Sequence, residues 1–250
     1  MIASRTAVLR GTPRRATLPD GVRIYAIGDI HGCADLLDDV IARMESHLAD
    51  NPVHRHIEVF LGDYIDRGPA SHRVLERLVT RYALHPEQMV CLKGNHETYV
   101  DEFIKSPSLL QSWQTLGGLE TLMSYGMKPT LKANAAAQIQ LAADFDKVLP
   151  NSHRQFLSRL RLTFSCGDFF FVHAGIRPGI ALERQREEDM LWIREDFLLC
   201  EDDFGKIVVH GHSPVLEPEV RSNRINVDTG AYATGRLTCL ILERDEIDFL

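Results

Sequence analysis

Aspartate, histidine and asparagine side chains recur beside glycines in five separate segments of this sequence. The residues concerned are Asp29, His31, Asp63, Asn95, His173 and His212. Because the set mixes oxygen and nitrogen donors and contains no cysteine, it favours a borderline transition metal, manganese first and iron, zinc or cobalt next, over magnesium or calcium. Two such ions together clamp the attacking and leaving oxygens of a phosphoryl transfer. Asp63 is the natural bridge, since one carboxylate can span two ions.

Each of these segments also has an ordinary structural explanation when it is taken alone. A Gly-Asp pair after a strand is usually a turn, and a buried histidine such as His173 is more often a core residue. Arg67-Gly68-Pro69 is equally compatible with a turn that enters a helix. The same residue types recur at corresponding places along the chain, however, and this repetition favours a metal site.

The elements that carry these residues alternate between strands and helices. Short apolar runs over 22–27, 56–61 and 89–92 predict strands, and helical spacing of apolar residues predicts helices over 34–48 and 70–83. A β-α-β-α-β series is typical of a mostly parallel, buried sheet, so the predicted fold class is α/β. The polar residues follow the carboxyl ends of the strands, where open α/β sheets bind their ligands.

The remainder of the chain divides into three parts. Residues 1–20 are basic and turn-rich and predict a loose N-terminal arm, which leaves 21–250 as a single domain. Residues 98–160 have a helical pattern throughout and predict a helical insertion that shapes substrate access. The last part predicts strands over Leu162–Cys166, Phe169–His173, Ile207–Val209, Arg224–Val227 and Leu237–Leu242, followed by a short terminal strand.

Composition narrows the possible partners and the compartment. The 250 residues include 28 Lys and Arg against 35 Asp and Glu, a net charge of -7, which disfavours binding to a nucleic-acid backbone. A phosphate substrate must then find much of its positive charge in bound metal. The five cysteines form no CxxC pair, and no apolar run reaches the length of a signal h-region or a membrane span. We therefore expect a cytoplasmic protein without membrane or nucleic-acid partners.

The motifs together resemble those of a known family. Residues 28–32 (GDIHG), 62–68 (GDYIDRG) and 94–97 (GNHE) are similar to the three signature motifs of the phosphoprotein phosphatases, which belong to the calcineurin-like metallophosphoesterases. Residues 172–175 and 211–214 resemble the family's remaining metal-ligand motifs, and the likeness is closest to small bacterial and bacteriophage serine/threonine phosphatases. The resemblance implies a four-layer α/β/β/α sandwich that holds two divalent metal ions.

That resemblance also assigns roles to individual residues. It implies one ion held by Asp29, His31 and Asp63, and a second held by Asp63, Asn95, His173 and His212. In the family, water activated by the two metals attacks phosphorus directly, and no phosphoenzyme forms. His96 would then protonate the leaving group while Asp66 orients the imidazole, a pairing that raises its basicity.

Two arginines are implied as phosphate ligands. Arg67 belongs to the second signature motif, and its planar guanidinium suits bidentate contact with phosphate oxygens. Residues 191–195 (LWIRE) resemble the segment that supplies a second phosphate-binding arginine in the phage-type members, which indicates Arg194. An ordinary exposed helical arginine is the alternative for Arg194.

Two neighbouring choices concern the end of the chain. His210 and His212 both follow a predicted strand, and the Gly-His match selects His212 as the ligand, with His210 in the core or behind the ligands. A strand-end turn explains Asp228, which receives no chemical role. Eukaryotic members carry an extended C-terminal part with a tyrosine-bearing loop, whereas this chain ends soon after Leu237–Leu242, so toxin sensitivity and regulatory subunits are not implied.

Three functions remain to be weighed. The first is a metal-dependent phosphomonoester hydrolase, a serine/threonine protein phosphatase acting on phosphorylated protein or a small phosphoester, which Asp66-Arg67 and Glu97 favour. The second is hydrolysis of dinucleoside polyphosphates such as diadenosine tetraphosphate, by relatives that usually lack the acid at the position of Asp66. The third is a non-catalytic scaffold, which the intact set of ligands and His96 argues against.

Overall fold

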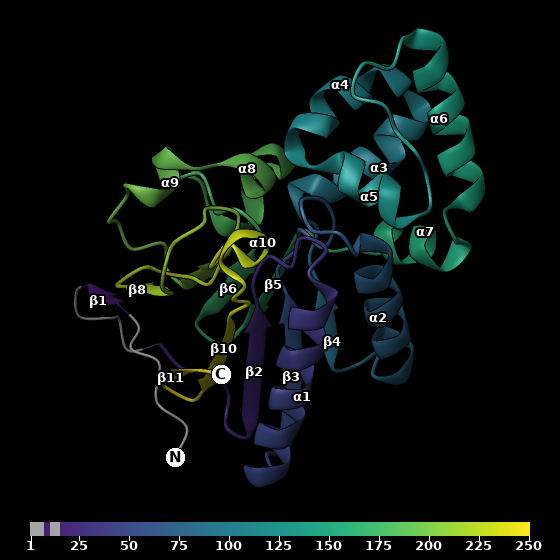
Figure 1. Cartoon of the computed structure of the whole chain (residues 1–250). Coiled ribbons are helices and arrows are strands. Elements are labelled where there is room, and N and C mark those ends of the chain that lie inside the picture. Colours follow the sequence, from purple (N-terminus) through teal and green to yellow (C-terminus); the bar gives the residue numbers. More distant parts are fainter. Residues whose placement is uncertain (1–7, 11–15) are drawn as a thin grey trace.

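Two β-sheets lie face to face between layers of helices in the computed structural model, which describes residues 8–10 and 16–250 of the chain (Figure 1). The first sheet has the strand order β11-β10-β2-β3-β4. Its strands are β2 (Val22–Ile27), β3 (Arg55–Phe60), β4 (Met89–Cys91), β10 (Cys239–Glu243) and β11 (Glu246–Phe249). Strands β2, β3 and β4 are parallel, as predicted, and β10 runs antiparallel to β2.

The second sheet has the order β1-β8-β9-β7-β6-β5. Its strands are β1 (Val8–Arg10), β5 (Thr163–Cys166), β6 (Phe169–Val172), β7 (Ile207–His210), β8 (Glu219–Arg221) and β9 (Arg224–Asn226). The parallel strands β6, β7 and β9 form its centre. The carboxyl ends of β6 and β7 therefore lie beside each other, which brings the segments that follow them together.

Helices cover the outer faces of both sheets. The first sheet carries α1 (Ala34–Asp50) and α2 (Ser71–Leu84). The second carries the short helices α8 (Glu187–Trp192) and α9 (Glu195–Leu198), preceded by the 3₁₀ turn η3 (Leu182–Arg184), while α10 (Ala231–Thr234) follows β9. Both α8 and α10 lie above the upper ends of the strands in Figure 1.

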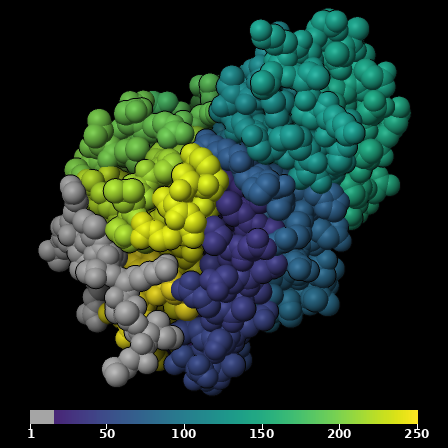
Figure 2. Space-filling view, in the orientation of Figure 1, coloured from purple at the N-terminus to yellow at the C-terminus, as the bar shows by residue number. Residues whose placement is uncertain are grey.

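The segment from 98 to 160 is helical, as predicted, and projects as a separate lobe (Figure 2). It comprises α3 (Asn95–Lys105), η1 (Pro107–Leu109), α4 (Leu110–Trp113), η2 (Gln114–Leu116), α5 (Gly118–Ser124), α6 (Ala135–Val148) and α7 (Asn151–Ser158). Its aromatic core includes Phe103, Trp113 and Phe145, and it is continuous with the core beneath α1 and α2. The lobe is thus packed onto the first sheet's helical layer.

Alternation along the strands explains the layering. In β2, Ile24 and Ala26 pack between the two sheets, whereas Tyr25 and Ile27 face the helices. A third cluster joins the outer face of the second sheet, at Phe170, to α8 and α9. Both faces of each sheet are therefore buried, and the predicted α/β class and four-layer α/β/β/α arrangement are confirmed.

The described part of residues 1–20 is more ordered than the sequence predicts. β1 pairs in parallel with β8, and Ala16 and Leu18 are buried against the inter-sheet core. The rest of the predicted arm lies outside the described residues. None of the helices in the described part of the chain combines the length and hydropathy that a membrane span requires.

Candidate metal centre

The predicted metal ligands meet at one end of the two sheets. They follow the strands directly: Asp29 and His31 after β2, Asp63 after β3, Asn95 after β4, His173 after β6 and His212 after β7. All six are buried. Since parallel strands present their carboxyl ends at one edge, residues up to 183 positions apart in sequence come into contact there.

Asp63 lies at the middle of this arrangement. One carboxylate oxygen, Oδ2, is 3.5 Å from His31 Nε2 and 3.7 Å from His96 Nε2. The other, Oδ1, is 3.4 Å from His173 Nε2. Two groups spaced for metal binding result, and Asp63 belongs to both: His31, Asp63 and His96, and Asp63, His173 and His212. The sequence assigned Asp29 to the first group, whereas the geometry also brings His96 within ligand spacing there.

The histidine tautomers favour metal binding. The Nδ1 atoms of His31 and His173 donate to the backbone carbonyls of Ile65 and Leu61, each at 2.9 Å. The Nε2 atom of each ring therefore carries no proton, and its lone pair is available to a metal ion. His173 Nε2 then lies 3.0 Å from Asn95 Oδ1, although both atoms are acceptors in this state. A cation among these atoms would satisfy all of them together.

Two further buried atoms have no hydrogen-bond partner among the described residues, Asp29 Oδ1 and His212 Nε2. The other oxygen of Asp29 accepts a bond from the backbone N–H of His212 at 3.0 Å, so the two residues are held side by side. A Cβ atom at Gly211 would lie 2.0 Å from Asp29 Oδ1, which explains the glycine there. A carboxylate oxygen and an imidazole nitrogen that lack hydrogen-bond partners are suitable ligands for a pair of divalent cations.

The buried carboxylates at the strand ends would also be stabilised by positive charge. Burial, followed by the carboxylates of Asp228 and Asp63, raises the pKa of Asp29 well above its ordinary value. Burial lowers the pKa of His31 to about 3, so its imidazole is neutral, as a metal ligand must be. A cation neutralises the carboxylates without competition from protonated histidine.

The backbone around the site is strained. Among the described residues, six that are not glycine have positive φ, and five belong to the site segments: His31 (45°), Asp63 (51°), Asp66 (71°), Arg67 (65°) and His212 (64°). Such conformations cost of order 1–3 kcal/mol each and are kept where function requires them. These left-handed turns direct the side chains toward the cluster at the carboxyl ends of the strands.

Glu97 holds the turn that carries Asp63. Its carboxylate accepts hydrogen bonds from the backbone N–H groups of Asp63, Tyr64 and Gly94, at 2.9, 2.8 and 2.8 Å. Glu97 was not predicted as a site residue. Its position directly after Asn95 and His96 in the third motif was the signal that could have identified it.

His96 and Asp66 form the predicted pair. His96 Nδ1 donates to Asp66 Oδ2 at 2.7 Å. Asp66 also accepts bonds from Trp113 Nε1 at 2.8 Å and Thr121 Oγ1 at 2.6 Å, both in the helical lobe. Burial opposes protonation of His96, yet the carboxylates of Asp63 and Asp66 raise its pKa above the ordinary value. The geometry suits an imidazole that donates a proton.

The two predicted arginines lie at the edges of the site. Arg67 Nη1 donates to the hydroxyl of Tyr232 at 2.8 Å, and its guanidinium carbon lies 4.7 Å from the centre of the tyrosine ring. Tyr232 also lies edge-on to His31, with ring centres 5.4 Å apart. Arg194 is exposed, and its Nη1 is 3.4 Å from Ser213 Oγ. Tyr232 was not predicted, because it reaches His31 and Arg67 only through the position of α10 in the fold.

His210 stands apart from both metal-binding groups. Its Nδ1 donates to the carbonyl of Gly211 at 3.0 Å, and its ring lies edge-on to Phe197, 4.9 Å between centres. Burial lowers its pKa to about 3, so the ring is a neutral core residue. The carboxylate of Asp228 is close enough to the site to raise the pKa of Asp29.

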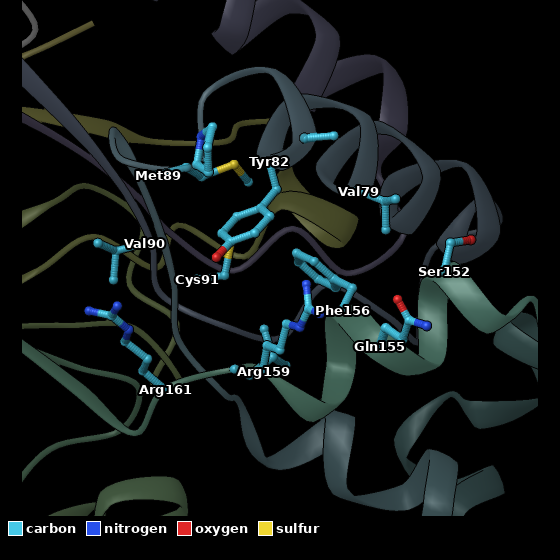
Figure 3. A pocket seen from close by; sticks show the side chains of 13 residues that line it. Val79, Tyr82, Met89, Val90, Cys91, Ser152, Gln155, Phe156, Arg159 and Arg161 are labelled. Carbon is cyan, nitrogen blue, oxygen red and sulfur yellow. The ribbon is translucent and has the colours of Figure 1, made fainter.

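A separate cavity of about 260 Å³ lies between α2, β4 and α7 (Figure 3). Its walls include Tyr82, Met89, Phe156 and Arg159, which Figure 3 shows around one opening. None of the predicted site residues lines it. The metal centre is therefore a buried cluster at the strand ends and lies apart from this open, largely apolar cavity.

Comparison with known proteins identifies relatives of this chain. A curated relative from Bacillus thuringiensis, "Bis(5'-nucleosyl)-tetraphosphatase PrpE [asymmetrical]", is 28% identical over 234 residues, which cover 86% of this chain and 88% of the relative. A crystal structure titled provisionally as a diadenosine tetraphosphatase superposes with a TM-score of 0.61, 19% identity and 98% coverage of both chains.

A serine/threonine phosphatase from Saccharomyces cerevisiae, described as similar to human PP5, has the same fold, with a TM-score of 0.52, 18% identity and coverage of 88% of this chain and 72% of the other. The sequence profile of the family described as "Calcineurin-like phosphoesterase" matches residues 22–249. The resemblance seen in the sequence motifs is thus confirmed, and the protein belongs to the calcineurin-like phosphoesterase family of metal-dependent hydrolases.

Proposed function

We propose that this protein hydrolyses dinucleoside tetraphosphates, such as diadenosine tetraphosphate, at a centre of two divalent cations joined by Asp63. The geometric observation behind the reaction class is that the two oxygens of Asp63 face different histidines, His31 and His173. The substrate class is supported by the PrpE relative, which aligns over 86% of this chain. This reverses the order of the two functions weighed from the sequence.

The six predicted ligands would hold the cations, and manganese remains the proposed metal. When bound, two divalent cations supply positive charge to the phosphate oxygens and activate water for attack on phosphorus. Arg67 and Arg194 would bind the outer phosphate oxygens through charge-assisted hydrogen bonds, and their contacts with Tyr232 and Ser213 at the edges of the site support this role. Tyr232 fixes the direction of the Arg67 guanidinium.

Hydrolysis moves one water molecule across a phosphoanhydride bond. The water oxygen bonds to phosphorus, the bond from that phosphorus to the bridging oxygen breaks, and the bridging oxygen leaves with a nucleotide. His96 donates a proton toward that oxygen, and Asp66 keeps the imidazole aligned. Asymmetrical cleavage of diadenosine tetraphosphate in this way gives ATP and AMP.

A second candidate is hydrolysis of phosphoserine or phosphothreonine in proteins. The hydrogen bond between His96 and Asp66, at 2.7 Å, favours it. A serine alkoxide is a much poorer leaving group than a phosphate, whose second pKa is about 6, so a monoesterase depends more heavily on a general acid. The pair is compatible with both substrates but matters more for the second.

A side-by-side assay of manganese-loaded protein tests the proposal. We expect chromatography to show ATP and AMP from diadenosine tetraphosphate, with a kcat/KM above that for phosphoserine peptides. Two ADP molecules as the product would contradict asymmetrical cleavage. Intact diadenosine tetraphosphate beside dephosphorylated peptide would replace the proposal with the second candidate.

A further inference from the structure

A hollow of about 540 Å³ lies under α8 and the turn before it. Its walls include Arg177, Arg184, Arg186 and Trp192. The volume is within the roughly 300–1,000 Å³ range of small-molecule sites. None of the predicted site residues lines it, and the roles assigned so far do not use it.

Trp192 connects this hollow to the metal centre. Its indole ring lies edge-on to the imidazole of His212, with ring centres 6.3 Å apart. At the same time 41% of Trp192 is exposed, so part of its indole ring is open to a ligand in the hollow. A flat aromatic face between a buried metal cluster and an open hollow is a ready platform for stacking a planar ring.

The charge of the hollow suits phosphate or ribose oxygens. Arg177 is held by Asp189, with Nη2 at 2.5 Å, and by Asp196. Arg186 makes one exposed contact with Glu188, at 3.3 Å. Arg184 is exposed, and its side chain has no hydrogen bond or ion pair within the part of the chain that the structure describes. Its guanidinium is therefore free to bind an anion.

The hollow lies beside the metal centre, exposes the flat face of Trp192 and contains the unpaired Arg184. These three features together favour one class of ligand. We propose that this hollow binds one nucleoside end of the substrate, with the base stacked on Trp192 and Arg184 beside the adjoining phosphates or ribose. The inference rests on the proposed dinucleotide substrate and deepens it. A phosphopeptide needs no planar platform, so the subsite distinguishes the two candidate substrates.

Substitution of Trp192 tests the subsite by a comparison of two substrates. In Trp192→Ala we expect the KM for diadenosine tetraphosphate to rise about 5- to 150-fold, the weight of stacking one base. The KM for a phosphoserine peptide without aromatic residues, which has no planar ring to stack, should rise far less. Trp192→Phe should restore most of the lost affinity for the dinucleotide, and Trp192→Leu should not, because only the former keeps an aromatic face.

A surface variant keeps the test independent of folding. Arg184→Ala should raise the dinucleotide KM about 10-fold, which corresponds to one charge-assisted hydrogen bond. Leu199→Ala serves as the control, because Leu199 is 78% exposed and lies outside the hollow. The KM values of this variant for the dinucleotide and for the comparison substrate should both be unchanged. Hydrolysis of diadenosine tetraphosphate with unchanged KM in the Trp192→Ala and Arg184→Ala variants overturns the subsite alone. Failure of the unaltered protein to hydrolyse it overturns the proposed function and the subsite together.

Discussion

The histidines at and near the Asp63 carboxylate have three different environments. His31 and His173 are fixed by backbone carbonyls and direct Nε2 toward Asp63, His96 is fixed by Asp66, and His210 packs on Phe197. The bond at Nδ1 fixes each ring, and the groups that its Nε2 faces determine what the ring can do, since Nδ1 of His210 also donates to a backbone carbonyl. The role of each histidine is therefore testable one residue at a time.

His96→Asn should separate the two candidate substrates. We expect turnover of phosphoserine peptides to fall about 10²–10⁴-fold, since the alkoxide leaving group requires the proton. Turnover of diadenosine tetraphosphate should fall less, because its leaving group is a phosphate. His54→Asn, an exposed histidine near the opposite end of the first sheet, is the control. Equal losses on both substrates would remove His96 from its role as proton donor.

His212→Ala and His210→Ala form a matched pair. The first should lower the bound metal measured by elemental analysis, because His212, unlike His210, belongs to a group spaced for metal binding. The second should keep the metal and lower the free energy of unfolding, because a buried ring is lost from the contact with Phe197. The reverse order would show that the wrong histidine was chosen.

At the scale of elements, the helical lobe does more than cover the site. Thr121 of α5 donates to Asp66 Oδ1 at 2.6 Å and accepts from the backbone N–H of Asp66 at 2.8 Å, while Trp113 of α4 donates to Oδ2. The lobe thereby holds the carboxylate that orients His96. Residues 98–160 were predicted to shape substrate access, and these contacts add a positioning role.

Thr121→Val tests that role with a side chain of nearly the same shape. We expect the free energy of unfolding to fall by about 1–3 kcal/mol, because a buried carboxylate loses a hydrogen bond. The kcat for phosphoserine peptides should fall as well, with KM little changed. Thr115→Val, where the hydroxyl bonds only Ser112 on the surface, should alter neither quantity. Unchanged kcat in Thr121→Val would show that the lobe does not position His96 through Asp66.

Local patterns predicted most elements, and they failed where pairing depends on distant residues. β2 matches its predicted range of 22–27, and α1 and α2 differ from theirs by one or two residues at an end. β1 and β8 were not predicted, because β1 pairs with β8 across 211 positions and β8 (Glu219–Arg221) has a single apolar residue between two charged ones. The motifs identified residues that do cluster at the strand ends for the opposite reason, since each needs only a strand end and a glycine.

The residues that support the site were harder to predict than those within it. Trp113 and Thr121 approach Asp66 only because the lobe folds back, and Tyr232 reaches His31 only through α10. Nothing in the local sequence of these three residues indicates such contacts. Side-chain partners contributed by distant elements require the three-dimensional fold.

At the scale of the whole molecule, an acidic chain gathers its buried carboxylates at one point. The net charge is -7, and Asp29, Asp63 and Asp228 are all buried at the strand ends. Repulsion among them destabilises the fold unless positive charge is present. Metal binding should therefore contribute to the stability of the domain as well as to its activity.

Removal of metal by a chelator should abolish hydrolysis and lower the Tm. With free manganese at about 100 times its Kd, mass action adds about 2.7 kcal/mol per site, which for a chain of this length raises the Tm by roughly 5–10 °C for each of the two sites. Differential scanning calorimetry with manganese, and with the chelator, measures this shift. The same Tm in both conditions would contradict a metal site built from these buried residues.

The central claim is that Asp63 joins two cations into one reaction centre, and metal stoichiometry tests it most directly. Elemental analysis of the fully active, manganese-loaded protein should find two ions per chain, and Asp63→Ala should lose both with its activity, since Asp63 belongs to both metal-binding groups. A single ion per chain in the fully active protein, or two ions retained in Asp63→Ala, would contradict the account.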